Sequence, residues 1–242
     1  MVRASDRPTA TALRLPIDPL APSLRVIAKA TALLRRGGLV VFPTDTLYAL
    51  GADASNTRAL ERLFTAKGRS RVKPISLLVA DLAMATRVAG ELPAPAARLA
   101  ERYWPGPLTL LLSAPPGVCC RLSGGTDRIG LRVPNAPVAL ALIERLGRPI
   151  TGTSANRSSG KDPRDAEEVL RQLGDQVDWV LDGGPVPIGS PSTVLDVTVN
   201  PPVVIREGEV SREEILRFLE LQPLPQPDPR HGGKRTKAFE TA

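Results

Sequence analysis

Hydroxyl and cationic side chains gather in short clusters, and each cluster adjoins an expected strand end or helix end. The stretch PTDT at residues 43–46 follows an apolar strand and places one carboxylate between two threonines. The stretch KGRSRVK at residues 67–73 ends a helix, with Lys67 as a compact charge and Arg69 as a planar fork. Both side chains can hold phosphate oxygens, so these clusters point to the binding and polarisation of anions.

Two further clusters belong to the same chemistry. TGTSANRSSG at residues 151–160 follows a strand with small residues, which lets backbone amides approach a phosphate closely. It matches neither a Walker loop nor a GxGxxG motif. GSPSTVLD at residues 189–196 is followed by Arg206 at the end of the next strand. Because ligands of open α/β sheets collect beyond strand ends, these positions favour a site for an anionic ligand.

Each cluster, taken alone, also has an ordinary structural explanation. PTDT can be a turn whose side chains bond to local backbone. The basic run can be a solvated helix end, and the small-residue stretch can be a serine-rich linker. The hydroxyls near Arg206 can belong to an exposed strand edge.

The histidine and cysteine content excludes several mechanisms. The only histidine is His231, in a tail expected to be disordered, so a Ser-His-Asp triad, a Cys-His pair or a histidine metal site has no histidine to use. Cys119 and Cys120 are adjacent, which disfavours a structural disulfide between them and fits a reducing compartment. Chemistry in this chain must therefore rest on binding and electrostatics, with any metal carried by the substrate.

The composition is that of a globular protein with a basic charge balance. Of its 242 residues, 42% are apolar and 24% charged, while aromatics are only 3%, which argues against a nucleic-acid binder built on stacked aromatics. The net charge of +7 favours an anionic partner, although an ordinary basic protein would show the same charge. Basic residues concentrate at 58–73 and 230–237. With no apolar leader and no apolar run that could span a bilayer, we expect a cytoplasmic protein without membrane contact.

Helices and strands are expected to alternate, which predicts an α/β fold in one domain around a twisted, largely buried sheet. Two helices are expected between Asp81 and Trp104, and periodicity and end signals predict others over residues 22–38, 56–68, 136–147, 165–174 and 211–219. Short apolar runs predict strands over residues 39–44, 75–80, 108–114, 128–134, 149–156, 178–184, 192–198 and 202–208. Composition predicts a flexible N-terminal segment at 1–20, a folded domain at 21–220 and a disordered basic tail at 221–242.

Seven motifs follow one another between about Leu24 and Leu219: PTDTLYALG, KGRSRVKP, PGPLT, GLRVP, TSANRSSG, STVLD and IREG. In this order they resemble the motifs of the YrdC-like family, the threonylcarbamoyl-AMP synthases. The resemblance implies a YrdC-like α/β fold in its single-domain form, with a twisted mixed sheet flanked by helices around a deep basic cavity. It implies a nucleotidyltransferase, an L-threonylcarbamoyladenylate synthase, that joins L-threonine, bicarbonate or CO2 and ATP and releases pyrophosphate. The product would pass to a tRNA-modifying threonylcarbamoyl transferase complex that acts on the adenosine next to the anticodon.

The resemblance also implies roles for individual residues. The positions that match threonine contacts are Thr46, Arg132 and Ser192. The positions that match the ATP and carbonate region are Lys67, Arg69, Ser154, Asn156 and Arg206. Mg2+ is expected to arrive with ATP, and no side chain is assigned as metal ligand, nucleophile or base. Asp45 has no assigned role.

Two other functions remain open. One is the binding of tRNA or double-stranded RNA by the basic surface without catalysis, which would show a steep dependence of affinity on salt. The other is a paralogue of the same fold that has lost the synthase reaction, or a carbamoyl-transfer module like those of hydrogenase maturation. That module normally belongs to a larger chain with zinc-binding and acylphosphatase segments.

Overall fold

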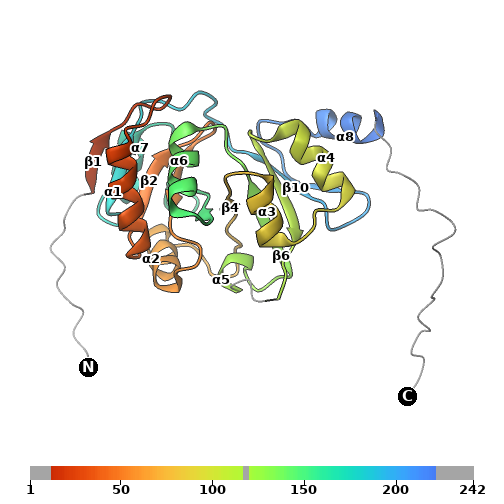
Figure 1. The fold of residues 1–242 in the computed structure, drawn as a ribbon, viewed down its shortest axis with the longest axis horizontal. Coiled ribbons are helices and arrows are strands. Elements are labelled where there is room, and N and C mark those ends of the chain that lie inside the picture. Colours follow the sequence, from red (N-terminus) through yellow and green to blue (C-terminus); the bar gives the residue numbers. More distant parts are fainter. Residues whose placement is uncertain (1–11, 117–119, 222–242) are drawn as a thin grey trace, which may run out of the picture.

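Helices and strands alternate along residues 12–116 and 120–221, the part of the chain that the computed structural model describes. The helices are α1 (Leu24–Arg35), α2 (Thr57–Lys67), α3 (Leu82–Ala89), α4 (Ala94–Tyr103), α5 (Cys120–Ser123), α6 (Pro137–Leu146), α7 (Ala166–Leu173) and α8 (Arg212–Leu221). The strands are β1 (Leu13–Pro16), β2 (Val40–Pro43), β3 (Tyr48–Gly51), β4 (Leu77–Leu78), β5 (Leu108–Ser113), β6 (Arg128–Arg132), β7 (Ile150–Thr151), β8 (Thr153–Ser154), β9 (Trp179–Asp182), β10 (Thr193–Asp196) and β11 (Val203–Arg206). The predicted α/β fold is confirmed (Figure 1). Most of the predicted basic tail, from residue 222 on, and residues 1–11 of the predicted N-terminal segment lie outside the described residues.

The strands form two mixed sheets, whereas the sequence predicts one. The first sheet has the order β1-β9-β2-β3-β8, and the second has the order β11-β10-β5-β6-β4-β7. Each combines parallel pairs, such as β1 with β9 and β10 with β5, with antiparallel pairs such as β2 with β3 and β5 with β6. Figure 1 shows α1, α2 and α6 in one half of the molecule and α3, α4 and α8 in the other.

One short segment, residues 150–154, joins the two sheets. Its first part, β7, pairs with β4 of the second sheet, and its last part, β8, pairs with β3 of the first. The strand predicted over residues 149–156 is therefore divided at Gly152, where an added Cβ would lie 2.7 Å from a Leu78 methyl carbon. A larger residue here would push the buried Leu78 side chain aside, which favours glycine at this crossover.

Local end signals explain where α2 begins and ends. The Asn56 side chain accepts a hydrogen bond from the Ala59 amide, and Gly68 adopts the left-handed conformation that ends the helix. The same logic holds for α7, where the Asp165 side chain accepts from the Glu168 amide. The helix predicted over residues 56–68 is confirmed by these contacts, and its end places Lys67 and Arg69 beside the sheets.

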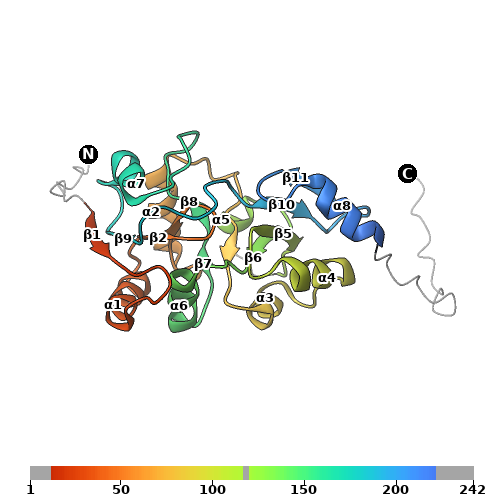
Figure 2. The same cartoon turned by 90° about the horizontal axis from the view of Figure 1, so that it is seen from above.

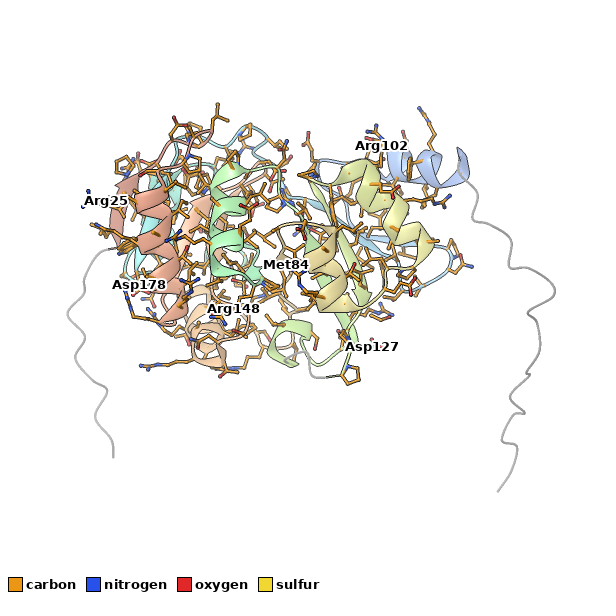
Figure 3. The ribbon with its side chains drawn as sticks, in the orientation of Figure 1. Arg25, Met84, Arg102, Asp127, Arg148 and Asp178 are labelled. Atoms are coloured by element: carbon orange, nitrogen blue, oxygen red, sulfur yellow. The ribbon has the colours of Figure 1, made fainter. Side chains whose placement is uncertain are left out.

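Amphipathic helices cover the sheets and close an aliphatic core. In Figure 2, α1, α6, α3 and α4 lie along one side of the sheets, and α7 lies on the other. Met84 of α3 is buried, whereas Arg25 projects from the outer side of α1 (Figure 3). Full burial of each large apolar side chain, such as Leu34 or Leu60, contributes roughly 1.5–3 kcal/mol to stability. Within residues 12–116 and 120–221, no helix combines the length and apolarity needed to cross a membrane.

The prediction of a flexible segment over residues 1–20 is wrong for Leu13–Pro16, which form β1. This strand pairs in parallel with β9, more than 160 positions away along the chain, and the Ile17 amide extends the pairing to the Asp182 carbonyl oxygen (2.9 Å). The segment is rich in proline and threonine and lacks a hairpin partner nearby, so its local pattern does not reveal the strand. The hydrophobic periodicity of a segment cannot reveal a strand partner that lies so far away along the chain.

Candidate active site

The PTDT motif forms the turn between β2 and β3, and its polar side chains are buried. Thr44 Oγ1 donates to the Leu47 carbonyl oxygen (2.6 Å) and accepts from the Leu47 and Thr46 amides (both 3.2 Å). The three residues Thr44, Asp45 and Thr46 are between 3% and 5% exposed. Thr44 therefore performs the local bonding expected of a turn, while the motif as a whole forms the buried polar wall of a site.

Arg132, at the end of β6, connects this turn to the second sheet. Its Nη1 donates to Thr46 Oγ1 (2.8 Å), its Nη2 donates to Asp45 Oδ1 (2.5 Å), and its Nε donates to the Gly106 carbonyl oxygen (2.8 Å). Burial lowers the pKa of the Arg132 guanidinium, and the Asp45 charge opposes that shift. Two of the three residues predicted to contact threonine thus touch each other directly.

Asp45 is a site residue for which the sequence predicts no role. It forms a buried ion pair with Arg132, 87 positions away, so nothing local distinguishes it from a turn-capping aspartate. Its second oxygen, Oδ2, is buried and has no hydrogen-bond partner among the described residues. Asp45 and Thr46 are further held by their carbonyl oxygens, which accept from the Ile188 and Gly189 amides.

A cavity of about 320 Å³ is lined by strands of both sheets and gathers most of the predicted site residues. The predicted residues that line it are Thr46, Arg69, Arg132, Ser154, Ser192 and Arg206. Further polar groups on its wall are Thr44, Ser76, Thr109, Thr153 and Asp162. Three arginines against one aspartate give the lining a positive balance, so the cavity favours anionic ligands.

Ser192 and Arg206 form one unit at the edge formed by β10 and β11. Arg206 Nη2 donates to the Ser192 carbonyl oxygen (2.7 Å) and to Ser192 Oγ (3.3 Å), and Ser192 Oγ shares a hydrogen bond with Thr109 Oγ1 (2.9 Å). Burial lowers the pKa of the Arg206 guanidinium, and the Asp162 charge acts against that shift. The predicted threonine contact and the predicted ATP contact therefore hold each other in position.

Lys67 and Asn156 are buried beside the cavity, and neither is among the described residues that line it. Lys67 Nζ donates to the Ser154 carbonyl oxygen (2.5 Å), the Asn156 carbonyl oxygen (2.7 Å) and Asn156 Oδ1 (3.1 Å). Burial lowers the pKa of the Lys67 ammonium to about 7, and repulsion from Arg69 acts in the same direction. The phosphate contacts predicted for these two residues stay predictions, while the geometry shows that they support the loop of Ser154.

Arg69 lies just beyond α2 on the cavity wall. Its Nη2 donates to the Pro74 carbonyl oxygen (2.8 Å), which fixes the plane of the guanidinium against its own loop. Burial and the nearby Arg206 charge lower the pKa of Arg69. Two guanidinium groups close enough to repel each other are stabilised by an anion between them, which suits a phosphate or a carboxylate.

Asp162 is a second cavity residue that sequence reasoning missed. It follows the TSANRSSG motif and lines the cavity because the loop folds back over β3. No local sequence pattern predicts this return of the loop. In the described part of the chain, no group of three or more histidine, cysteine, aspartate or glutamate side chains could hold a metal ion. A Mg2+ ion that keeps its waters and arrives on the phosphates of a nucleotide is compatible with such a lining.

The sequence and the fold agree with a family of known proteins. The Sua5_yciO_yrdC family model, described as "Telomere recombination", matches residues 32–208. This chain therefore belongs to the Sua5/YciO/YrdC family.

Named relatives match most of the chain. It is 40% identical over 199 residues to the threonylcarbamoyl-AMP synthase of Bacillus subtilis (strain 168), a match that covers 82% of this chain and 58% of the relative. It is 41% identical over 190 residues to the threonylcarbamoyl-AMP synthase of Pyrococcus abyssi (strain GE5 / Orsay), covering 78% of this chain and 56% of the relative. The chain thus spans little more than half the length of these two relatives.

Solved structures confirm the fold. The crystal structure of P. abyssi Sua5 complexed with L-threonine superposes with a TM-score of 0.83 at 38% identity, covering 86% of this chain and 61% of that one. The crystal structure of Escherichia coli YciO superposes with a TM-score of 0.77 at 33% identity, covering 84% of this chain and 99% of that one. The predicted YrdC-like fold class is confirmed.

Proposed function

We propose that this chain is a threonylcarbamoyl-AMP synthase, a nucleotidyltransferase that uses L-threonine, bicarbonate or CO2, and ATP. The observation that carries the proposal is the single cavity in which the residues expected at both substrates meet: Thr46, Arg132 and Ser192 for threonine, and Arg69, Ser154 and Arg206 for ATP. The names of the B. subtilis and P. abyssi relatives, and the threonine complex of the P. abyssi protein, support the same assignment.

At the threonine end, Arg132 is the group suited to the substrate carboxylate. Its guanidinium is buried and oriented by Asp45, Thr46 and Gly106, so little side-chain freedom is lost when a carboxylate binds. Thr46 Oγ1 and Ser192 Oγ add hydroxyl dipoles to the same cavity. A carboxylate here would accept charge-assisted hydrogen bonds, which are stronger than neutral ones.

At the nucleotide end, Arg69 and Arg206 face the same cavity and would hold phosphate oxygens. Ser154 adds a hydroxyl, and its loop is braced by Lys67 and Asn156. Mg2+ would come with ATP and neutralise charge on the phosphates. Among the described residues that line the cavity only Asp162 carries a carboxylate, so phosphate oxygens and waters would supply most of the ligands of the metal.

The reaction needs no side-chain nucleophile. Threonine and bicarbonate give an N-carboxylated threonine with loss of water and a proton, and the new carboxylate attacks the α-phosphate of ATP and displaces pyrophosphate. Both steps develop negative charge, and preorganised guanidinium and hydroxyl groups can stabilise that charge in a cavity partly closed to water. Holding three reactants in one place supplies much of the remaining rate enhancement.

We further propose that the product is passed to a threonylcarbamoyl transferase complex that modifies tRNA beside the anticodon. ATP, bicarbonate and tRNA are all present in the cytoplasm, where we place the activity. The unstable mixed anhydride would need a nearby acceptor, so a tRNA or its enzyme complex is the expected partner. The basic charge of the chain suits contact with an acidic partner of this kind.

The test is pyrophosphate release by the purified chain with ATP, Mg2+, bicarbonate and threonine. We expect release that depends on threonine, and an Arg206→Ala variant that loses about 100-fold or more of the rate, since one preorganised charge donor is worth that much. Arg25→Ala, an exposed arginine of α1, is the matched control and should keep the wild-type rate. No threonine-dependent release at high protein concentration would refute the synthase, and salt-dependent RNA binding without it would favour the RNA-binding alternative.

A further inference from the structure

The loop that follows β8 folds back over the start of β3 and carries Asp162 into the cavity. The Ala155 amide donates to the Tyr48 carbonyl oxygen (2.8 Å), and the Tyr48 amide donates to the Pro163 carbonyl oxygen (3.1 Å). Asp162 precedes Pro163 in the chain, and its charge acts on Arg206, whose guanidinium donates to Ser192, a residue expected to contact threonine. Both Thr46 and Asp162 line the cavity.

Asp162 is the only carboxylate among the described residues that line this cavity, against the three guanidinium groups of Arg69, Arg132 and Arg206. Its charge acts on Arg206, but within the described residues it makes no hydrogen bond with any of these arginines and accepts only a long one from Asn156 Nδ2 (3.4 Å). That amide nitrogen already donates at 2.8 Å to the Gly160 carbonyl oxygen. The carboxylate is therefore held near the site with most of its accepting capacity unused.

A carboxylate in this position would be costly for a cavity that bound only anions, because it repels them as the arginines attract them. It is favourable if one part of a ligand is cationic. Threonine carries both charges: its carboxylate suits Arg132, while its α-ammonium would be repelled by three arginines unless an acidic group lay opposite. A primary ammonium has three donors, and a carboxylate is the strongest acceptor for them.

We propose that Asp162 binds the α-ammonium group of the amino-acid substrate and thereby makes the cavity selective for an α-amino acid over an analogue that lacks the ammonium group. The inference rests on the proposed function, since it concerns the threonine of that reaction. With the carboxylate held at Arg132 and the ammonium at Asp162, the amino acid is fixed at two points. Its nitrogen then lies in the same cavity as the arginines that would hold bicarbonate.

The test compares two ligands that differ at one group: L-threonine and its α-hydroxy analogue, in which a hydroxyl replaces the ammonium. Affinity is measured by calorimetry for the wild-type chain and for Asp162→Asn, which keeps the shape of the side chain and removes its charge. We expect threonine to bind about 10- to 100-fold more weakly to the variant, the range for a hydrogen bond to a charged group, and the analogue to bind both proteins equally. Glu167→Gln is the matched control: it removes a charge from the nearby helix α7, on a side chain 71% exposed, and should leave threonine binding unchanged.

The outcomes separate the ligand contact from a structural role. Equal weakening of threonine and of the analogue would show that Asp162 only shapes the loop, and unchanged threonine binding would show no contact; either result overturns the inference. If either of these results is found while the wild-type chain still releases pyrophosphate with threonine, the proposed function stands and only the role of Asp162 is refuted. If the wild-type chain neither binds threonine nor releases pyrophosphate, the proposed function and this inference fail together.

Discussion

Arg132 and Asp45 show how a buried charge is kept in the wall of this site. Arg132 is 5% exposed and its guanidinium donates to three acceptors, of which Asp45 is the only charged one. A buried ion pair of this kind adds little net stability by itself, but removing one partner leaves the other as an uncompensated charge. The main effect of the Asp45–Arg132 ion pair is therefore to keep the guanidinium charged and oriented toward the cavity.

Asp45→Asn is therefore expected to lower the free energy of unfolding by about 3 kcal/mol, because it leaves the Arg132 charge buried without its counter-charge. Urea unfolding of the purified variant measures this loss. Arg132→Met should be destabilised as well, and the double variant should be more stable than the sum of the single losses predicts, by about 1–3 kcal/mol. Asp18→Asn, at an exposed aspartate outside the cavity, is the matched control; strictly additive losses for Asp45 and Arg132 would contradict the coupling.

At this scale the sequence predicts the cations of the site better than its carboxylates. Arg132, Arg206 and Thr46 stand in recognisable motifs, and the cavity brings them together as expected. Asp45 and Asp162 have no distinctive local setting, since their importance comes from partners brought near by the fold. The sequence therefore predicts which groups could bind anions, while the position of the opposing charges depends on tertiary structure.

At the scale of elements, the IREG motif acts through its glycine as well as its arginine. Gly208 follows β11, and its amide donates to Thr193 Oγ1 (2.9 Å). A Cβ added at Gly208 would lie 2.2 Å from the Pro191 carbonyl oxygen and 2.6 Å from the Ser192 carbonyl carbon. These are backbone atoms that cannot rotate away, so the glycine lets the end of β11 lie against the segment that carries Ser192.

Gly208→Ala is expected to push this segment away from β11 and to misplace Ser192 and Arg206 together. Stability should fall by about 1–3 kcal/mol, the usual cost of overpacking, and the rate of threonine-dependent pyrophosphate release should fall roughly 10- to 100-fold. The control is Gly90→Ala at the end of α3, where an added Cβ meets no atom within 4 Å. It should lose some stability from its positive φ and keep its activity; a Gly208→Ala variant with wild-type rate would show that this contact does not position the site.

The elements themselves were largely predictable where their signals are local. Asn56 and Gly68 bound α2 as the sequence predicts, and the Ser211 hydroxyl accepts from the Glu214 amide at the start of α8. The division of the predicted 149–156 strand into β7 and β8 was not predictable. Each half pairs with a different sheet, and these pairings depend on strands that lie far away along the chain.

At the scale of the whole molecule, the N-terminal boundary of the folded domain follows from β1 rather than from composition. The Ala12 amide donates to the Gly174 carbonyl oxygen (2.6 Å), the Leu13 amide donates to the Asp178 carbonyl oxygen (3.0 Å), and Arg14 pairs with Asp182. Ala12 and Ile17 are each 7% exposed. β1 is thus an edge strand that covers β9, and the first sheet is incomplete without it.

A chain that begins at residue 21, the boundary that composition predicts, is therefore expected to be less stable than one that begins at residue 12. It loses the pairing of β1 with β9 and the burial of Ile17, which together are worth about 3 kcal/mol. It also leaves β9 as an unpaired edge, so it should associate at high concentration, because open strand edges pair with other chains.

Urea unfolding and size-exclusion chromatography of the two truncated chains measure both effects. The chain that begins at residue 12 removes none of the described contacts and is the matched control. Equal unfolding midpoints for the two chains would show that β1 adds nothing to the domain, and the boundary near residue 21 would then be the correct one.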